Sequence, residues 1–344
     1  MRNKTIGVRD KILKLVDIAP NELVEQAVEM LGISRQAVYR HIKALIEEDR
    51  LDYKTVSNKR IYSYGNVREL TKTIILDGDV SEYDVYLKYF DWVEKDLADN
   101  VKAIIEYGFS EMLNNVIDHS EAETCTIIVK KNTDKIEIYI HDDGEGIFDR
   151  ITRLKKLSDP RQALLELQKG KLTTDPSNHT GEGIFFSSRA FDEFVIQSGG
   201  LLFLHKDIHK NNYLLENAQS NNGTNVIMTI KTNSKTELPD IFDDFAEADE
   251  YSFNKTIVPI RLAKMGNENL VSRSQAKRVL LRLENFKTII FDFVEVDRIG
   301  QAFADEIFRV YQNKHKDIAL KYTNTTKAVE QMIQRAYINN KQSE

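Results

Sequence analysis

The chain of 344 residues has one cysteine, Cys125, and only 5 prolines. A single thiol cannot form a disulfide within the chain, and without a second cysteine a zinc knuckle is not expected. No apolar run approaches the roughly 18 residues that a membrane-spanning helix needs. The first residues also lack the apolar core and the cleavage site of a secretion signal. These absences predict a cytoplasmic protein without a membrane association.

Charge is distributed unevenly along the chain. The net charge of −6 argues against nonspecific coating of nucleic acid. Residues 1–65 nevertheless hold 12 Lys and Arg against 9 Asp and Glu, whereas the rest holds 36 against 45, so the N-terminal segment is mildly basic. A composition of 41% hydrophobic and 30% charged residues is typical of folded protein. Because the length exceeds one ordinary core, we predict two or three domains.

Residues 1–65 show the pattern helix, helix, glycine turn, helix and hairpin. Gly32 follows the second helix, where a left-handed residue commonly ends a helix, and Ser34 is a good N-cap for the third. Ser57 and Asn58 supply the turn of the hairpin. The helices are predicted at 8–16, 21–31 and from Ser34 onward, and the strands at 51–56 and 60–64. The segment closely resembles the bacterial winged-helix family, in which "GISRQAVYRH" marks the turn and the recognition helix.

This resemblance implies DNA binding by the outer face of the third helix, with phosphate contacts from the hairpin. The candidate residues are Ser34, Arg35, Gln36, Tyr39, Arg40, Lys43, Lys59 and Arg60. One copy alone would bind weakly, so a homodimer that engages two half-sites is expected. The alternative is a small helical interaction module whose basic residues are merely solvated.

Residues 66–100 are predicted to be a helical connector. An aromatic-rich stripe at helical spacing comprises Tyr83, Tyr86, Leu87, Phe90, Val93 and Leu97. Together with Trp92, these residues are expected to pack in the core or in a dimer interface and not to form a ligand cage.

The segment "FSEMLNNVIDHS", residues 109–120, is an amphipathic helix with an unusual polar side. Its apolar residues recur at i, i+3, i+4, i+7 and i+8, which predicts one buried stripe. Glu111, Asn115 and Asp118 follow one another at i, i+4 and i+7 and can point into one space, with His119 beside them. The pattern indicates the wall of a site.

Two glycine turns are expected to meet this helix. An alternating strand ends in "HDDGEG", a tight turn that places the carboxylate of Asp142 at its mouth and lets backbone approach a ligand. Gly181 and Gly183 precede a helix, whose free N–H groups and positive end suit a phosphate. Either glycine pair alone is weak evidence, because such turns are common.

Taken in order, the motifs resemble the GHKL ATP-binding family, which includes gyrases and histidine kinases. Glu111-x-x-x-Asn115 with Asp118 and His119 is similar to its N box. The first glycine box is matched by Asp142-x-Gly144-x-Gly146 with Ile147, the second by Gly181-x-Gly183, and the closing Gly-Thr motif by Gly223-Thr224. The likeness covers about 135 residues. It implies a site for ATP and Mg²⁺.

The resemblance also implies a role for each residue. Asp142 would accept the adenine amino group and Asn115 would hold Mg²⁺. Glu111 would act as a general base for water, or would prepare a receiving group in a protein kinase. Asp118 and His119 either line the phosphate side or are exposed. The other candidates for ATP binding are Gly144, Gly146, Ile147, Gly181, Gly183 and Thr224.

Residues 148–182 would fold over the nucleotide as a lid. Its lysines are expected to be solvated, with phosphate contact as the alternative; they are Lys155, Lys156, Lys169 and Lys171. No Gln-Thr-Lys type loop is found, so strong gyrase-like hydrolysis is not expected. No His-Glu-x-x-x-Pro motif is found either, which argues against a sensor histidine kinase.

Residues 255–344 alternate between strand and helix three times. "KTIIFDFVEVDRIGQAFADEIFRVY" resembles STAS and STAS-like domains, some of which are phosphorylated on a Ser or Thr in one loop. The matching loop, 297–303, contains no hydroxyl, so a contact module and not a phosphate acceptor is implied. Ser272 and Ser274 are expected to be helix N-caps, and Asp305 and Glu306 to be surface residues. The acidic segment 236–251 is expected to separate this domain from the previous one.

The predicted fold class is multidomain α+β. It comprises a winged helix-turn-helix at 1–65, a helical connector at 66–100, a GHKL (Bergerat) α/β sandwich at 101–235 and a STAS-like βαβαβα domain at 255–344. The predicted function is that of an ATP-binding, slowly hydrolysing DNA-binding regulator whose Mg-ATP occupancy controls dimerisation or partner contact. The alternatives are a Ser/Thr protein kinase acting on a separate STAS-like partner, and a protein that only binds ATP.

Overall fold

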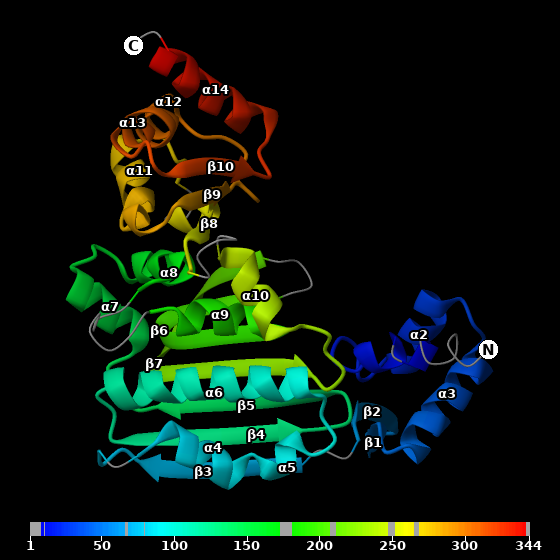
Figure 1. Cartoon of the computed structure of the whole chain (residues 1–344). Coiled ribbons are helices and arrows are strands. Elements are labelled where there is room, and N and C mark those ends of the chain that lie inside the picture. The colour runs from blue at the N-terminus through cyan, green and yellow to red at the C-terminus, as the bar shows by residue number, and fades with distance from the viewer. Residues whose placement is uncertain are drawn as a thin grey trace.

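The computed structural model describes residues 8–341, apart from 10, 66–67, 79, 173–180, 207–210, 247–251 and 265–267. The chain is an α/β protein of several parts, and Figure 1 shows an N-terminal module (8–65), a sheet domain (68–246) and a C-terminal domain (252–341). Buried apolar residues form two clusters, one inside the N-terminal module and one that runs through the other two parts. Within the described residues, no helix combines the length and the apolar character needed to span a membrane.

The N-terminal module has the predicted helices and hairpin. A first helix covers 8–9 and 11–14, and it is followed by α2 (Leu23–Leu31), α3 (Arg35–Glu47), β1 (Leu51–Val56) and β2 (Lys59–Tyr64). Gly32 ends α2 with a φ of 63°, and the Ser34 hydroxyl accepts a hydrogen bond from the Ala37 N–H at 3.2 Å. Ser57 and Asn58 both have positive φ, as the tight two-residue turn between twisted strands requires.

The sheet domain is built on one antiparallel sheet in the order β3-β4-β5-β7-β6. Its strands are β3 (Arg68–Ile75), β4 (Thr124–Lys131), β5 (Lys135–Asp142), β6 (Glu193–Lys206) and β7 (Asn211–Lys231). β4 and β5 alternate between buried and half-buried residues, so one face of the sheet lies against the helices.

The prediction of a helical connector at 66–100 is wrong for 68–75. These residues form β3, which pairs antiparallel with β4 from Arg68 opposite Lys131 to Ile75 opposite Thr124. The segment "RELTKTII" is rich in β-branched residues, but most of its side chains are exposed because β3 lies at the edge of the sheet. An exposed edge strand has little apolar alternation, which explains why the pattern was not read as a strand.

Helices cover one face of the sheet, and Figure 1 shows α6 lying across it. They are α4 (Glu82–Tyr89), α5 (Asp91–Glu94), α6 (Asp99–His119), α7 (Ile147–Lys155), α8 (Pro160–Lys169), α9 (Gly183–Ala190) and α10 (Leu238–Phe245). The predicted stripe of α6 is buried from Phe109 to Val116. Within the aromatic stripe of α4, Tyr86 and Phe90 are buried as expected, whereas Tyr83 and Leu87 are exposed on the outer side.

The N-terminal module rests on the turn between β4 and β5. The guanidinium of Arg50 lies 2.8 Å from Asp134 Oδ1, and Lys135 Nζ lies 3.7 Å from Asp17 Oδ1. The Thr133 hydroxyl also donates to the Asp49 carbonyl at 3.4 Å. This contact is mainly polar, in contrast to the apolar contact between the sheet domain and the C-terminal domain.

The C-terminal domain has a parallel sheet in the order β10-β9-β8. Its elements are β8 (Lys255–Pro259), the 3-10 turn η2 (Ile260–Ala263), α11 (Arg273–Leu280), η3 (Leu283–Asn285), β9 (Thr288–Asp292), α12 (Gln301–Asp305), the π-helical η4 (Glu306–Tyr311), α13 (Gln312–Lys314), β10 (Ala319–Thr323) and α14 (Lys327–Lys341). Ser272 caps α11 in a capping box with Gln275, as predicted, whereas the prediction of Ser274 as an N-cap is wrong because it is the second residue of α11. Asp305 and Glu306 are buried, so their prediction as surface residues is wrong; Asp305 forms an ion pair with Arg309 at 2.6 Å.

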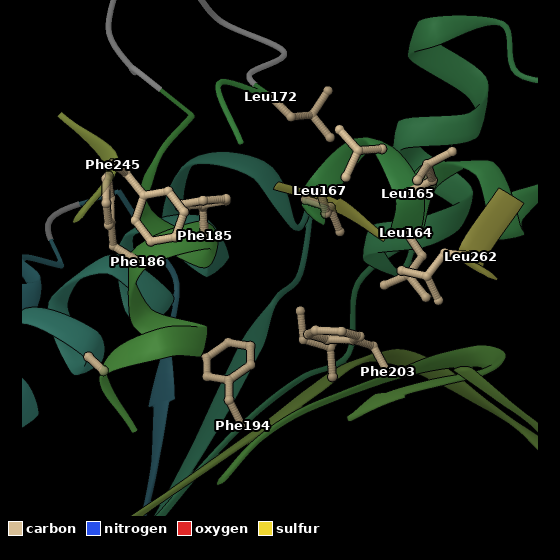
Figure 2. Packing of buried hydrophobic residues seen from close by; sticks show 14 of the residues in the cluster. Leu164, Leu165, Leu167, Leu172, Phe185, Phe186, Phe194, Phe203, Phe245 and Leu262 are labelled. Carbon is tan, nitrogen blue, oxygen red and sulfur yellow. The ribbon is translucent and has the colours of Figure 1, made fainter. Parts of the chain in front are cut away.

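Aromatic packing joins the sheet domain to the C-terminal domain. The acidic segment at 236–251 is described up to Ala246 and contains α10, whose Phe245 ring lies 4.9 Å from that of Phe185 in α9. Phe253 contacts Phe185 at 4.6 Å and Phe286 of the C-terminal domain at 5.4 Å. Figure 2 shows Phe185, Phe186 and Phe245 packed together. The segment expected to separate the two domains therefore carries part of their shared core.

Candidate functional site

A cavity of about 270 Å³ opens between α6, α7 and the start of α9. Its volume is near the lower end of the roughly 300–1,000 Å³ that is common for small-molecule sites. The candidate residues that line it are Glu111, Asn115, His119, Asp142, Gly146, Ile147, Gly181, Gly183 and Thr224. Asp118 and Gly144 do not line it. Four segments that are far apart in the sequence, 111–119, 142–147, 181–183 and the residue 224, thus meet at one cavity.

Asp142 lines the cavity at the end of β5 and is only 2% exposed. Its Oδ1 accepts hydrogen bonds from the backbone N–H of Gly144 at 2.9 Å and of Thr224 at 3.2 Å. Burial raises the pKa of Asp142, and these two hydrogen bonds oppose part of that shift. Within the described residues no hydrogen bond reaches Oδ2, so this oxygen can accept one from a ligand.

Glycine is required around Asp142 because backbone packs against it. A Cβ at Gly223 would overlap the Asp142 carbonyl, and a Cβ at Gly144 would overlap the Ser120 carbonyl. Gly144 therefore supports the carboxylate from behind without touching the cavity. Gly146 has a φ of 91° and precedes α7, whose first N–H, that of Ile147, is bound by the Thr224 hydroxyl at 3.0 Å.

The wall made by α6 follows residues spaced by four. Glu111, Asn115 and His119 line the cavity on successive turns, whereas Asp118 is exposed. A step of four residues turns a helix by about 40° beyond a full turn, while a step of seven falls about 20° short of two turns. The cavity crosses α6 obliquely, along the row of residues that are spaced by four. This row includes His119 and does not include Asp118.

Asn115 is oriented by its own helix. Its Nδ2 donates to the Glu111 carbonyl at 2.8 Å, and because that carbonyl can only accept, the amide is turned with Oδ1 away from it. Oδ1 is an oxygen ligand of the kind that Mg²⁺ prefers. The donor set is small: no group of three or more His, Cys, Asp and Glu side chains that could hold a metal ion occurs in the described residues.

Glu111 lies against the first turn of α9. A Cβ at Gly183 would overlap Glu111 Oε2, so a larger residue at 183 would require the Glu111 carboxylate to move. The start of α9 presents backbone N–H groups and the positive end of the helix dipole. Burial, together with the nearby carboxylates of Glu111 and Glu182, raises the pKa of Tyr107 far above its usual range. Glu111 and Glu182 therefore place two carboxylates in the cavity lining beside the start of α9.

Several lining residues were not predicted from the sequence. The polar ones are Asn114, Ser120, Arg150 and Glu182, and the apolar ones are Met112, Val116, Ile151, Leu167, Leu172, Ile184, Ile196 and Val226. Asn114 lies three residues after Glu111, and Arg150 lies four after Gly146, so helical spacing could have indicated both. Arg150 forms ion pairs with Glu121 at 2.5 Å and Glu145 at 3.7 Å at the rim.

The predicted lid differs from the structure in two of its lysines. Lys169, expected to be solvated, is 1% exposed and forms an ion pair with Glu166 at 2.5 Å. Lys171 donates to the Asn285 carbonyl at 3.1 Å and lies over the Phe286 ring. Neither lysine lines the cavity; both contact the C-terminal domain. Part of the predicted lid, 173–180, lies outside the described residues.

The candidate DNA-binding residues form one exposed surface on α3 and the hairpin. All eight of them are exposed, from Ser34 to Arg60. Arg35 forms an ion pair with Glu25, and Lys43 lies 3.7 Å from Glu47 on the next turn of α3. The Arg60 guanidinium stacks over the Tyr53 ring at 4.5 Å. The surface thus combines cations, amide and aromatic groups in one place.

Comparison with known families identifies one part of the chain. The model of the STAS-like domain of unknown function (DUF4325) matches residues 275–330. The prediction of a STAS-like domain is confirmed over this range, which runs from α11 into α14. A search of curated proteins found no match to the chain.

Proposed function

We propose that the cavity binds Mg-ATP and that the chain is an ATP-dependent, DNA-binding regulator. In this proposal the sheet domain is a GHKL-type α/β sandwich and the N-terminal module is a winged helix-turn-helix. The observation that carries it is the meeting of Asp142, Asn115 and the glycine turns at 146 and 181–183 around a single cavity. In this proposal the residues around Asp142 bind adenine and those around Glu111 bind phosphate.

Adenine fits the end at Asp142. A buried carboxylate oxygen accepts a hydrogen bond from an exocyclic amino group and disfavours guanine, which has an acceptor at that position. Apolar side chains around it, among them Ile147, Ile196 and Val226, would cover the faces of the ring. The glycine at 223 keeps the backbone close to Asp142 and so fixes the depth at which a base would sit.

Phosphate and Mg²⁺ fit the end at Glu111. Asn115 Oδ1 would hold the metal ion, and the N–H groups at the start of α9 would receive phosphate oxygens. When bound, Mg²⁺ would neutralise phosphate charge. The Glu111 carboxylate, held at the start of α9, would take a proton from water or from a receiving hydroxyl. One group would therefore serve either hydrolysis or transfer.

The second candidate function is a Ser/Thr protein kinase that acts on a separate STAS-like partner. The chain's own STAS-like loop, 297–303, offers no hydroxyl. A transferred phosphate would therefore have to go to another protein. Labelling of a co-purified protein by radioactive ATP would favour this function over the ATPase.

Calorimetric titration with Mg-ATP tests the proposed site. The wild-type protein should bind, and Asn115→Ala should weaken Mg-ATP by about 10- to 100-fold, because a lost oxygen ligand to a charged group costs about 1.5–3 kcal/mol. The control is Asp118→Ala, on the same helix but outside the cavity, which should bind like the wild type. Equal affinities in the wild type and in Asn115→Ala would contradict the assignment.

DNA binding is tested separately with Arg40, one of the two exposed arginines of α3. Arg40→Ala should weaken binding to mixed DNA fragments by about tenfold in fluorescence anisotropy and should reduce the dependence on salt by about one phosphate contact. Lys14→Ala removes an equally exposed cation from the first helix and is the control. If both variants bind DNA alike, the surface on α3 is not the DNA-binding face. Mg-ATP should change the DNA affinity of the wild type but not that of Asn115→Ala.

A further inference from the structure

Helix α8 contributes to two different surfaces. Leu167 on α8 and Leu172 just after it line the cavity, while Glu166 and Lys169 face the C-terminal domain. Every residue of α8 from Ala163 to Lys169 is buried. The same short segment is therefore a wall of the candidate nucleotide site and a part of the contact between two domains.

A buried ion cluster holds α8 to the C-terminal domain. Glu166 Oε1 lies 2.5 Å from Lys169 Nζ, and its Oε2 lies 3.0 Å from Nη1 of Arg282. Lys169 Nζ also donates to the Leu281 carbonyl at 2.8 Å, and the Lys169 carbonyl accepts from the Thr256 hydroxyl of β8 at 2.7 Å. Glu166 and Lys169 are 2% and 1% exposed. We call Glu166, Lys169 and Arg282 the α8 cluster.

The α8 cluster contains two cations and one carboxylate. Carbonyl oxygens at the end of α11, those of Arg278 and Leu281, compensate the second positive charge. Burial lowers the pKa of Lys169, and the ion pair with Glu166 opposes that shift. Removing one member leaves another charge buried without its partner, which is costly. The cluster therefore favours one defined arrangement over a loose contact.

Arg282 contacts the backbone next to the cavity. It sits in a left-handed conformation, with a φ of 63°, between α11 and η3. Its guanidinium donates to the carbonyls of Gly170 and Lys171, directly before the cavity residue Leu172. A side chain of the C-terminal domain thus fixes the backbone next to the cavity wall.

Apolar packing makes the contact rigid. Figure 2 shows Leu164 and Leu165 of α8 beside Leu262 of η2, with Leu167 and Leu172 on the other side of the helix end. These residues belong to the buried cluster that runs through both domains. Because close-packed interiors have discrete arrangements, a shift of α8 must move the C-terminal domain or break the contact.

We propose that the α8 cluster couples occupancy of the cavity to the docking of the STAS-like domain, with Arg282 as the positioning residue. This inference rests on the proposed nucleotide binding. A ligand that orders Leu167 and Leu172 stabilises the docked domain, and by reciprocity the docked domain strengthens ligand binding by the same factor. The partner contacts of the STAS-like domain then depend on the nucleotide state.

The first test needs no nucleotide. Arg282→Ala in the full chain should speed amide hydrogen exchange several-fold in 163–172 and 183–190, because the cavity wall loses its support. Arg298→Ala removes the same charge from an exposed position of the same domain and should leave these segments unchanged. Arg282→Lys keeps the positive charge but lacks the guanidinium group, so its exchange rate in these segments should lie between those of Arg298→Ala and Arg282→Ala. This variant keeps the coupling testable if Arg282→Ala does not fold. Equal exchange in the wild type and all three variants would overturn the coupling.

The second test uses Mg-ADP and a non-hydrolysable Mg-ATP analogue. In the wild type, the analogue should slow exchange in 275–286 by about fivefold or more, the lower range of typical coupling. In Arg282→Ala this protection should be lost, and the analogue should bind about fivefold more weakly. If calorimetry shows binding while 275–286 exchange as before, the coupling is overturned and the nucleotide site stands. If neither nucleotide binds, the proposed function itself falls.

Discussion

Asp142→Asn is expected to weaken Mg-ATP binding by about 100-fold or more, and to abolish any preference for ATP over GTP. The carboxylate accepts two backbone hydrogen bonds through Oδ1 and leaves Oδ2 for a ligand. An asparagine at this place would turn its NH₂ group either toward the backbone donors or toward the adenine amino group. In both cases two donors face each other, and a buried unsatisfied group costs about 1–3 kcal/mol beyond the lost hydrogen bond.

The control for this variant is the neighbouring acid. Asp143 receives hydrogen bonds from Glu123 N–H and Thr124 N–H at 3.0 Å and does not line the cavity. Asp143→Asn should therefore leave the affinity for Mg-ATP within about twofold of the wild type. Calorimetric titration of both variants with Mg-ATP and Mg-GTP gives the comparison. Equal losses in both variants would mean that the acidic turn acts through its stability and not through base recognition.

The same carboxylate sets the expected pH dependence. Because burial raises the pKa of Asp142, it takes up a proton at a higher pH than an ordinary aspartate, whose value is near 3.8. The protonated form is a poorer acceptor for adenine, so affinity should fall as the pH decreases through the raised pKa. The effect of pH on the free energy of unfolding has the opposite sign. The folded state binds this proton more tightly than the unfolded chain, so protonation of Asp142 as the pH decreases stabilises the fold. In Asp142→Asn the dependence of affinity on pH in this range should disappear.

Glu111→Gln is expected to reduce ATP turnover by about 100-fold or more while leaving nucleotide affinity within a few-fold. Glutamine keeps the shape that fits against Gly183 but cannot take a proton, and general-base catalysis contributes about 10²- to 10⁴-fold. Purified protein would be incubated with labelled ATP and scored for both released phosphate and labelled protein. The readout also separates hydrolysis from transfer.

The matched control is Glu106→Gln, which changes an exposed acid nearer the N-terminus of α6. It should turn over ATP like the wild type. If Glu111→Gln and the wild type release phosphate at the same rate, Glu111 is not the base. If the wild type shows no turnover above background while it binds Mg-ATP, the protein uses the nucleotide for binding alone.

Short-range signals predicted much of the local structure. The stripe of α6, the turn at 57–58 and the cap at Ser34 each depend on residues within about one helical turn or one hairpin. The same holds for the glycine turn after Asp142, where a Cβ would collide with nearby backbone. Such features follow from sterics and hydrogen bonding between near neighbours, which the order of residues expresses directly.

Errors arose where the environment comes from distant parts of the chain. Lys169 is predicted to be solvated because lysine usually is, but the carbonyls of Arg278 and Leu281 that accept hydrogen bonds from it lie more than a hundred residues away. The helical prediction for 68–75 is wrong because an edge strand has few buried side chains and so little alternation. The acidic segment before Phe253 was expected to be a boundary, yet its few phenylalanines decide how it packs.

The sequence by itself determined which residues have the chemistry for a site: an acid followed by glycines, an amide and an acid one turn apart, and a STAS-like segment near the end. The tertiary structure alone decided which of them share a cavity, because helix phase selects His119 over Asp118 and six separate elements, α6 to α9 with β6 and β7, supply apolar wall residues. It also decided that α8 is bound to the C-terminal domain. Burial and pairing depend on which distant surfaces meet, and no local pattern contains that information.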